Sequence, residues 1–551
     1  MKLRLFVPLF VILGITWSNA QAQLREKHHE VMDNSYVPVD KSLMPRQNTY
    51  QERRSTIITT QVNVDSNGED IIGDAGNEPS IAVDPTNPNR IVIGWRQFDT
   101  VTNNFRQGGY GYSLDGGMTF VFPGVLEPGI FRSDPVLDFD AEGNFYYNSL
   151  TQGFACDVWQ ITDGGVDWTG PYPAHGGDKQ WMRLDRTGGI GDKHNYSFWT
   201  SSFSTCDPGF FTRSTDGSMT FEDCEIIDND PFWGTLAVDK DGNLYLTGAS
   251  FGSIVLVKST TAKDPLQEVS WDFVTTVDLG GVLDAGFVLN PQGLIGQAWV
   301  ATGDSGNPGP ENVYVCASVV PTNDPSDVMF ARSTDGGLTF EPPVRINTDA
   351  VGHHNWFGTM SVAPNGRIDV VWLDTRDDPN NILSRLYYSF SEDQGTTWSP
   401  NEPLSPAFDS RVGWPQQNKM GDYFDMVSDD NYAHLAWANT LNGGQDVYYT
   451  RIDPEAIILN QANFQTSLFK GKAYPNPFSD GVQIAFNVPE KQHIKVTLYD
   501  ILGREVATLL DAEVDGLQQL SYTAPSTVKA GNYFVIVQGA QGKQALRITK
   551  R

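Results

Sequence analysis

The chain has 551 residues and a formal net charge of −29. Hydrophobic residues make up 39% of it, which is enough for a sizeable core and excludes a mainly disordered chain. The acidity comes without a basic cluster, so we expect no nucleic acid partner. The 12% of aromatic residues and the 53 glycines favour an all-β protein of short strands and tight turns.

Residues 1–22 are expected to be a secretory signal peptide. Lys2 and Arg4 precede an apolar run from Leu5 to Trp17, which is too short to span a membrane, and small residues follow it. Residues 23–55 form an N-terminal extension in this interpretation. No later stretch has about 18 apolar residues in succession, so we expect no transmembrane helix. The protein is also expected to be a monomer.

A short motif recurs along the chain, and repeats of this kind indicate an array of similar structural units. The motif is Ser-x-Asp-x-Gly-x-Thr followed by Phe or Trp, with Ser in place of Gly in one copy. The copies occupy residues 113–120, 214–221, 333–340 and 391–398, with a shortened copy at 162–168. The aspartate can accept hydrogen bonds from nearby backbone amides, so the motif predicts a tied hairpin loop with the terminal aromatic ring packed inward.

Each copy is preceded by strand-like segments joined by turn residues, which predicts a four-stranded sheet per unit. Such units arranged in a ring make a β-propeller over residues 56–453. The innermost strands are expected to begin near Pro79, Asp134, Gln180, Phe232, Gly286, Trp356 and Gly421. This count gives seven blades, with six as the alternative because the unit around Gly286 is irregular. Residues 57–65 are expected to complete the last blade and so to remove the open sheet edge.

The repeated motif resembles the Asp box of sialidase-like propellers, also called the BNR repeat. In that family the boxes lie away from the active site, which implies a structural role for Asp115, Asp163, Asp216, Asp335 and Asp393. The resemblance further implies an extracellular glycan or glycoprotein as partner.

The end of the chain has a different pattern. Residues 454–470 are expected to be a linker, and the short alternating strands of residues 471–551 predict a small Ig-like β-sandwich. Tyr474-Pro-Asn-Pro-Phe478, Leu498-Tyr-Asp and Gly531-Asn-Tyr-Phe are followed by a basic end. This order resembles the type A sorting domain of the type IX secretion system. The resemblance implies contact with that machinery and a secreted or outer-membrane surface location.

Ionisable residues recur where the innermost strands are expected to begin, at the face of a propeller that usually carries function. A pocket there could bind or hydrolyse a glycan, or the same groups could merely fill the channel. The candidate catalytic residues are Glu78, Asp134, Asp178, Asp422 and Tyr423. The candidate substrate-binding residues are Arg96, Arg132, Lys179, His354 and Arg376.

The sialidase resemblance implies three arginines around a substrate carboxylate, with a Tyr–Glu nucleophile pair. None of the arginines here stands in the family's Phe-Arg-Ile-Pro context. Two functions therefore remain open from the sequence. One is a glycoside hydrolase, and the other is a non-catalytic surface propeller that binds polysaccharide or protein.

No cofactor is required by either function. The sequence around Asp374, Asp377, Asp378 and Asn380 could bind calcium or be a solvated acidic loop. Four cysteines allow three pairings, of which Cys206–Cys224 is favoured because the two lie on neighbouring predicted strands. Their spacing does not fit a zinc site, and no metal site is assigned.

Overall fold

A computed structural model describes residues 34–161, 167–303, 311–458, 469, 471–501, 504–539 and 542–551. The predicted signal peptide and Asp163 lie outside these residues. The chain divides into two compact units, of which the first ends at Asp453 and the second begins at Pro454. In the described part no helix is long and apolar enough to cross a membrane. The helical segments in the described part are short: two 3₁₀ turns, η1 (Lys41–Leu43) and η2 (Ser201–Phe203), and the helical residues 454–458.

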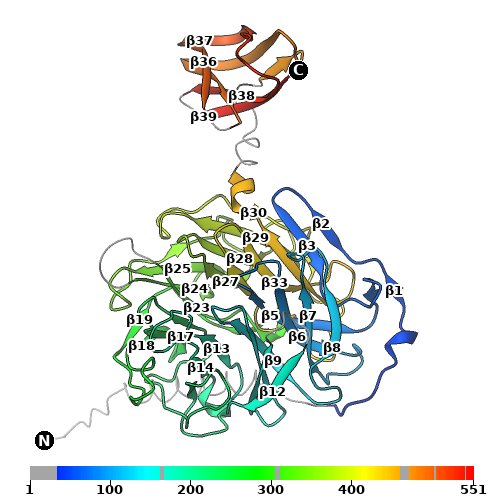
Figure 1. Ribbon diagram of the computed structural model, residues 1–551, viewed down its shortest axis with the longest axis vertical. Coiled ribbons are helices and arrows are strands. Elements are labelled where there is room, and N and C mark those ends of the chain that lie inside the picture. Colours follow the sequence, from blue (N-terminus) through cyan, green and yellow to red (C-terminus); the bar gives the residue numbers. More distant parts are fainter. Residues whose placement is uncertain are drawn as a thin grey trace, which may run out of the picture. The chain divides into compact units, whose positions relative to one another are not determined.

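The first unit is built from seven sheets that follow one another along the chain (Figure 1). The first sheet contains β5 (Ala75–Val83), β6 (Ile91–Phe98), β7 (Gln107–Ser113) and β8 (Val121–Val125). The second contains β9 (Ser133–Phe139), β10 (Phe145–Leu150), β11 (Cys156–Ile161) and β12 (Trp168–Pro173). The third contains β13 (Trp181–Leu184), β14 (Asn195–Phe198) and β15 (Phe211–Ser214), and the fourth contains β16 (Leu236–Val238), β17 (Leu244–Ser250), β18 (Ser253–Ser259) and β19 (Phe273–Val277).

The remaining sheets have extra strands. The fifth contains β23 (Trp299–Gly303), β24 (Asn312–Pro321), β25 (Asp327–Ser333) and β26 (Val344–Arg345), with β20 (Gly281–Val282) also paired to β24. The sixth contains β27 (Asn355–Val362), β28 (Ile368–Asp374), β29 (Leu383–Ser391), β30 (Glu402–Pro403) and β31 (Phe408–Asp409). The seventh contains β32 (Asp425–Ser428), β33 (Ala433–Asn439), β34 (Asp446–Ile452), β3 (Ile57–Gln61) and β2 (Gln51–Arg53). Two pairs stand apart, β1 (Arg46–Gln47) with β4 (Asp70–Ile71), and β21 (Ala285–Phe287) with β22 (Asn290–Leu294).

The seven sheets close into a ring around their first strands. Those strands are β5, β9, β13, β16, β23, β27 and β32, and each contacts the next, with β32 against β5. The last sheet is completed from the beginning of the chain, since Ile57 pairs with Ile452 and Gln61 with Tyr448. In Figure 1 the blue strands β2 and β3 accordingly lie beside the yellow strands of this sheet. The prediction that residues near 57 complete the last blade is confirmed.

One predicted strand start is wrong. The sequence pattern placed the fifth innermost strand near Gly286, but that residue lies in the separate hairpin of β21 and β22. The innermost strand of the fifth sheet is β23, which begins at Trp299. Both segments are apolar and interrupted by glycine, so the local pattern does not distinguish the inserted hairpin from the strand that follows it.

Aromatic and aliphatic side chains fill the spaces between neighbouring sheets. Trp95, Trp199, Trp372 and Trp437 are among the largest side chains that are fully buried. Glycine allows the close approach that this packing needs. A Cβ at Gly94 would lie 2.4 Å from the Tyr147 ring on the neighbouring sheet, so only glycine fits there.

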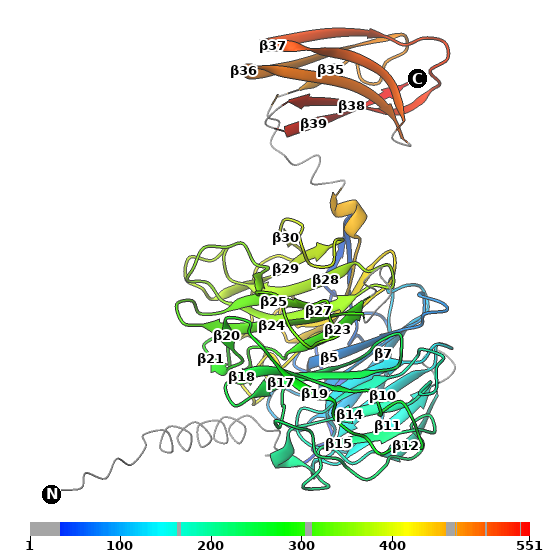
Figure 2. The same cartoon turned by 90° about the vertical axis from the view of Figure 1, so that its left-hand side faces the viewer.

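The second unit is a small β-sandwich with its own core. Its strands are β35 (Lys472–Tyr474), β36 (Gly481–Asp500), β37 (Glu505–Thr523), β38 (Gly531–Gly539) and β39 (Gly542–Lys550). Figure 2 shows the layers that these strands form. Alternate residues of β36, including Val482, Ile484 and Phe486, are buried in the core, as the period of a strand requires.

Candidate functional site

Each innermost strand of the first three sheets has, near its beginning, one residue in a rare backbone conformation. Glu78, Asp134 and Lys179 have φ angles of 49°, 46° and 58°. Glu78 lies where the register between β5 and β6 shifts, so the strand bulges at this point. Left-handed backbone is costly for residues with a Cβ and is concentrated at functional or tightly constrained sites. The backbone strain at these three residues is thus a free-energy cost that accompanies the placement of their side chains.

The three side chains meet in one ionic cluster, which we define as Glu78, Arg96, Asp134, Asp178, Lys179, Lys419 and Asp422. Glu78 lies 3.1 Å from both the Arg96 Nε and the Lys419 Nζ. Lys419 and Lys179 both reach the Asp422 carboxylate, at 2.8 and 2.6 Å. The Lys179 Nζ also lies 3.7 Å from Asp134 and 3.7 Å from Asp178. Acidic and basic groups thus alternate through the cluster.

The ionic cluster is closed to solvent. The relative exposure of its side chains is 5% for Lys419 and 0–1% for its other ion-paired members. Burial raises the pKa of Glu78 well above its usual range, with Arg96 and Lys419 acting in the opposite direction. Burial thus disfavours the ionised form of this carboxyl more than its two cationic neighbours favour it.

Aromatic rings close the cluster on one side. The Tyr423 hydroxyl donates a hydrogen bond to the Pro135 carbonyl at 2.8 Å, and burial raises the pKa of this phenol well above its usual range. The Tyr423 ring packs edge-on against Trp181, which packs in the same way against Trp299. Both tryptophans are buried. Tyr423 is thus fixed as a neutral hydrogen-bond donor in this structure.

Three of the sequence-predicted binding residues lie elsewhere. Arg132 pairs with Glu127 at 2.5 Å and with Asp157 at 2.8 Å, and its guanidinium lies over the Trp159 ring. Arg376 pairs with Asp374 at 2.6 Å on the sixth sheet and lies over Tyr387. His354 packs against Phe287, and burial lowers the pKa of its imidazole. Arg96, Arg132 and Arg376 each face a different carboxylate.

The repeated loops show the same hydrogen bonds in each of the four complete copies. In the copy at residues 333–340, the Asp335 carboxylate accepts from the Ser333 hydroxyl at 2.7 Å and from the Thr339 amide at 2.9 Å. The Thr339 hydroxyl donates to the other carboxylate oxygen at 2.6 Å. Equivalent bonds surround Asp115, Asp216 and Asp393. Each aspartate ties its own turn.

The acidic loop after β28 has internal partners as well. Asp377 accepts from Arg385 and from the Tyr387 hydroxyl, at 2.8 and 2.7 Å. Asp378 accepts from the backbone amides of Ile382 and Leu383. Calcium binding at this loop stays a prediction.

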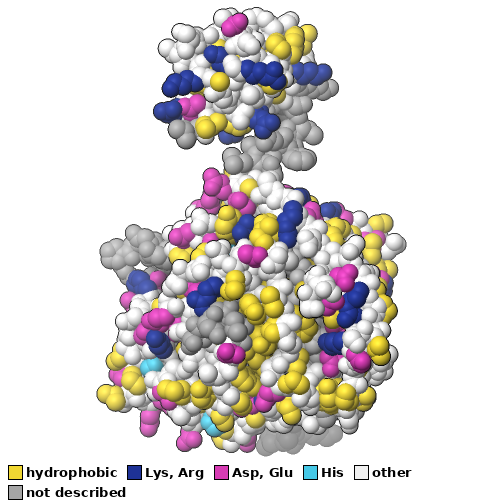
Figure 3. Space-filling model, turned by 45° about the vertical axis from the view of Figure 1, so that its right-hand side comes forward, with side chains coloured by type: hydrophobic (Ala, Val, Ile, Leu, Met, Phe, Trp, Pro, Cys, Tyr) yellow, Lys and Arg dark blue, Asp and Glu magenta, His cyan; other side chains and the backbone are white. Residues whose placement is uncertain are grey.

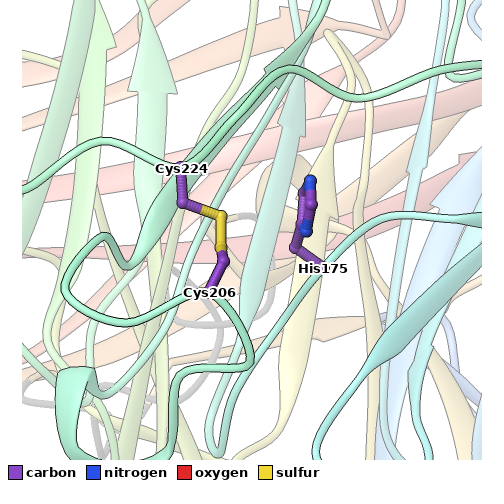
Figure 4. A group of neighbouring side chains, drawn as sticks. All are labelled: His175, Cys206 and Cys224. Atoms are coloured by element: carbon purple, nitrogen blue, oxygen red, sulfur yellow. A yellow bond between two sulfur atoms is a disulfide. The ribbon is translucent and has the colours of Figure 1, made fainter.

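Cys206 and Cys224 form a disulfide, so the favoured pairing is confirmed, although both cysteines lie in loops. Figure 4 shows His175 beside this bond. The potential ligand atoms of His175, Cys206 and Cys224 lie within 4.8 Å of one another, which is close enough to surround a metal ion. Two sulfurs that are bonded to each other are not thiolates, however, and the oxidised group offers no such site.

Two of the hollows among the described residues of the first unit concern the search for a site. One, of about 770 Å³, lies among the ends of the innermost strands, with Arg183, Trp299 and Met426 in its lining. The other, of about 630 Å³, is a groove between the loop after β14, the segment before β16 and the β17–β18 turn. Neither hollow includes a residue that the sequence singled out as catalytic or substrate-binding.

Two features of these sites escaped sequence reasoning. Lys419 lies in the loop before β32, two residues before the predicted strand start near Gly421, but the sequence pattern singled out only Asp422 and Tyr423 there. Phe251 lies in the second hollow. A signal for it was present, because Phe251-Gly252 occupies a tight turn where Asn-Gly is the usual pair.

On the face in Figure 3, acidic and basic side chains of the first unit are dispersed among hydrophobic and uncharged ones, whereas the charged side chains of the second unit are mostly Lys and Arg. Within the part of this face that is described, no continuous basic surface is visible.

Solved structures and one family model are similar to parts of this chain. Among curated proteins, none matches the sequence. A protein of unknown function from Dyadobacter fermentans has 14% identity and a TM-score of 0.43, over 73% of this chain and 98% of its own. The α-L-arabinofuranosidase Arb93A from Fusarium graminearum has 12% identity and a TM-score of 0.40, over 74% and 100%. A Trypanosoma rangeli sialidase has 10% identity and a TM-score of 0.35, over 92% and 89%.

Residues 472–551 match the family described as secretion system C-terminal sorting domain. This match agrees with the motifs of the last unit and covers nearly all of its sandwich. The first unit is an all-β propeller. The chain is therefore an all-β propeller protein with a C-terminal sorting domain, which type IX secretion delivers to the cell surface or the medium.

Proposed function

We propose that this protein is an exported propeller that binds an extracellular glycan without hydrolysing it. The observation that carries the proposal is the closed state of the ionic cluster. Hydrolysis of a glycoside uses two carboxyl groups, or a Tyr–Glu pair with an acid, that contact the scissile bond. Glu78, Asp134 and Asp422 are instead inaccessible and held by lysine or arginine.

The arrangement of the arginines supports binding over sialoside hydrolysis. A carboxylate-gripping site needs guanidinium groups that converge with unused donors. Arg96, Arg132 and Arg376 are each engaged with a separate carboxylate of the protein. The Tyr423 hydroxyl donates a hydrogen bond to the Pro135 carbonyl, and its ring packs against the buried Trp181, so it has no position from which to attack a sugar.

An activity panel tests the absence of hydrolysis. The exported protein is incubated with fluorogenic sialosides, arabinofuranosides and hexosides from about pH 4 to 8, and Glu78→Gln serves as the matched variant. We expect equal background rates in both proteins. A rate in the native protein that falls about a hundredfold or more in Glu78→Gln would contradict the proposal, since acid–base groups contribute at least that much.

A glycan array tests the binding half. We expect retention of a restricted set of extracellular glycans, abolished by heat denaturation of the protein. Failure to retain any glycan, with the protein shown to be folded by its circular dichroism, would remove the glycan from the proposal.

A further inference from the structure

The second hollow is a groove with a distinctive lining. Its lining residues are Ser201, Ser202, Asp207, Pro208, Phe210, Ile226, Ile227, Asp228, Asn229, Asp230 and Phe251. The groove opens at the end of the sheets where the innermost strands begin. The loop after β14 starts there because Phe198, the last residue of β14, pairs with Trp181, the first residue of β13. In the next sheet, Leu236, the first residue of β16, pairs with Leu246 of β17. Its volume of about 630 Å³ lies within the range of small-molecule sites.

Phe251 occupies a position that folding alone does not favour. Ser250 pairs with Ser253, so Phe251 and Gly252 form a two-residue hairpin turn. Their φ angles of 47° and 80° place both in the left-handed region, where Asn-Gly is strongly preferred and a bulky residue is an outlier. The Phe251 side chain is also 58% exposed. An apolar ring that is strained and largely unburied gains little from folding, which points to a ligand as its partner.

The walls of the groove are tied to one another. The Cys206–Cys224 disulfide joins the loop after β14 to the segment that leads into residues 226–230. The Ser250 hydroxyl donates to the Asn229 carbonyl, and Phe232 exchanges backbone hydrogen bonds with Ala249 at 3.0 and 2.7 Å. The hollow is therefore largely preformed, which lowers the conformational cost of binding.

The charge of the groove is of one sign. Its lining includes three aspartates and no lysine, arginine or histidine. Asp207 and Asp228 are exposed, and their carboxylates make no hydrogen bond or ion pair with the described part of the chain. A carboxylate or sulfate on a ligand would be repelled here. An aromatic face beside unpaired carboxylates suits a cationic, hydroxyl-bearing ligand.

We propose that the Phe251 groove binds an amino sugar that carries a free, protonated amine. The pyranose ring lies against the Phe251 ring, the ammonium group pairs with Asp207 or Asp228, and the hydroxyls contact Ser202 and Asn229. This inference rests on the proposed glycan binding and narrows it to one class of sugar.

Titration calorimetry on the exported protein tests the inference with three trisaccharides. These are the glucosamine trimer, its N-acetylated form and the neutral glucose trimer cellotriose. We expect the glucosamine trimer to bind at least about tenfold more tightly than the others, because only it carries the cation. Equal affinity for the N-acetylated trimer, or no binding of the glucosamine trimer, would overturn the inference.

Phe251→Asn separates binding from folding, because it installs the favoured Asn-Gly turn. We expect affinity for the glucosamine trimer to fall about tenfold, while the thermal unfolding midpoint stays equal or rises. Leu266→Asn is the matched control, since Leu266 is 92% exposed and lies outside the groove, and its affinity should be unchanged. Undiminished affinity in Phe251→Asn would overturn the proposed contact.

Asp228→Asn tests the charge. It should weaken binding of the glucosamine trimer and leave the affinity for the neutral trimer unchanged, and an equal effect on both would contradict the ion pair. The two proposals fail differently. A glycan array that is positive only for neutral or acidic sugars overturns this inference alone, whereas an empty array overturns both.

Discussion

At the scale of single residues, the fold uses rare backbone conformations at two different places. Glu78, Asp134 and Lys179 are left-handed and direct charged groups into a closed cluster. Phe251 is left-handed and directs an apolar ring toward solvent. The same backbone strain thus occurs at buried side chains that form ion pairs and at an exposed ring without such partners. The burial of each side chain is what distinguishes the two cases.

The aspartates of the repeated loops stabilise the fold locally. Asp335→Ala removes the acceptors for the Ser333 hydroxyl and for the Thr339 amide and hydroxyl. We expect the free energy of unfolding to fall by about 1–2 kcal/mol, the usual cost of such losses in a partly exposed turn. Urea denaturation measures this. Glycan affinity serves as the control and should not change, and a changed affinity would give this loop a role in the site.

Asp74 makes stability depend on pH. Burial raises the pKa of this carboxyl from 3.8 to about 7, although Lys41 lies 3.5 Å away. The unfolded chain therefore loses this proton at lower pH than the native protein does, so stability falls as pH rises from about 4 to 7. Asp74→Asn should flatten the dependence of unfolding free energy on pH over that window, by an amount on the order of 4 kcal/mol.

Denaturation midpoints at pH 4.5 and 7.5 measure the Asp74 effect. Asp241→Asn is the control, because the side chain of Asp241 is 58% exposed. The control should retain the slope of the native protein. An equal slope in Asp74→Asn would show that other carboxyls account for the dependence.

At the scale of elements, the closing sheet is held by backbone bonds between distant parts of the chain. Thr59 of β3 pairs with Thr450 of β34, and their hydroxyls lie 3.0 Å apart. Thr59→Pro removes the amide and fits poorly within a strand between two neighbours. We expect a loss of about 3 kcal/mol or more in the free energy of unfolding. Leu43→Pro, in an exposed η1 residue outside the ring, is the comparison and should cost much less.

Sequence reasoning was most successful for elements that repeat. The motif fixes its own loop through contacts within eight residues, so the blade pattern and the closing strand could be predicted. The hairpin of β21 and β22 could not, because it occurs once and has the composition of a strand. Site residues were predicted in part. Glu78, Asp134 and Lys179 lie at repeat positions, and Lys419 lies close to another predicted strand start and pairs with its neighbour Asp422. The pairing of Lys419 with Glu78 joins distant parts of the chain, and no local pattern encodes it.

At the scale of the whole molecule, the two units have separate cores and separate tasks. A variant that ends at Asp453 retains every strand of the ring and loses the sorting domain. We expect its thermal unfolding transition to match that of the propeller in the full chain. We also expect it to accumulate inside the outer membrane, as measured by resistance to protease added to intact cells. Export of the shortened chain would contradict the role of the last unit.

The seventh sheet gives the ring a dependence on complete synthesis. Its strands β2 and β3 leave the ribosome early, and β34, the partner of β3, follows about 390 residues later. A chain that stops before residue 446 has no partner for β3 and retains an open sheet edge. Proteases and aggregation act on such edges, and a closed ring lacks them. Because β3 pairs with the last strand of the ring, only a chain that has been translated through its last blade can close the propeller.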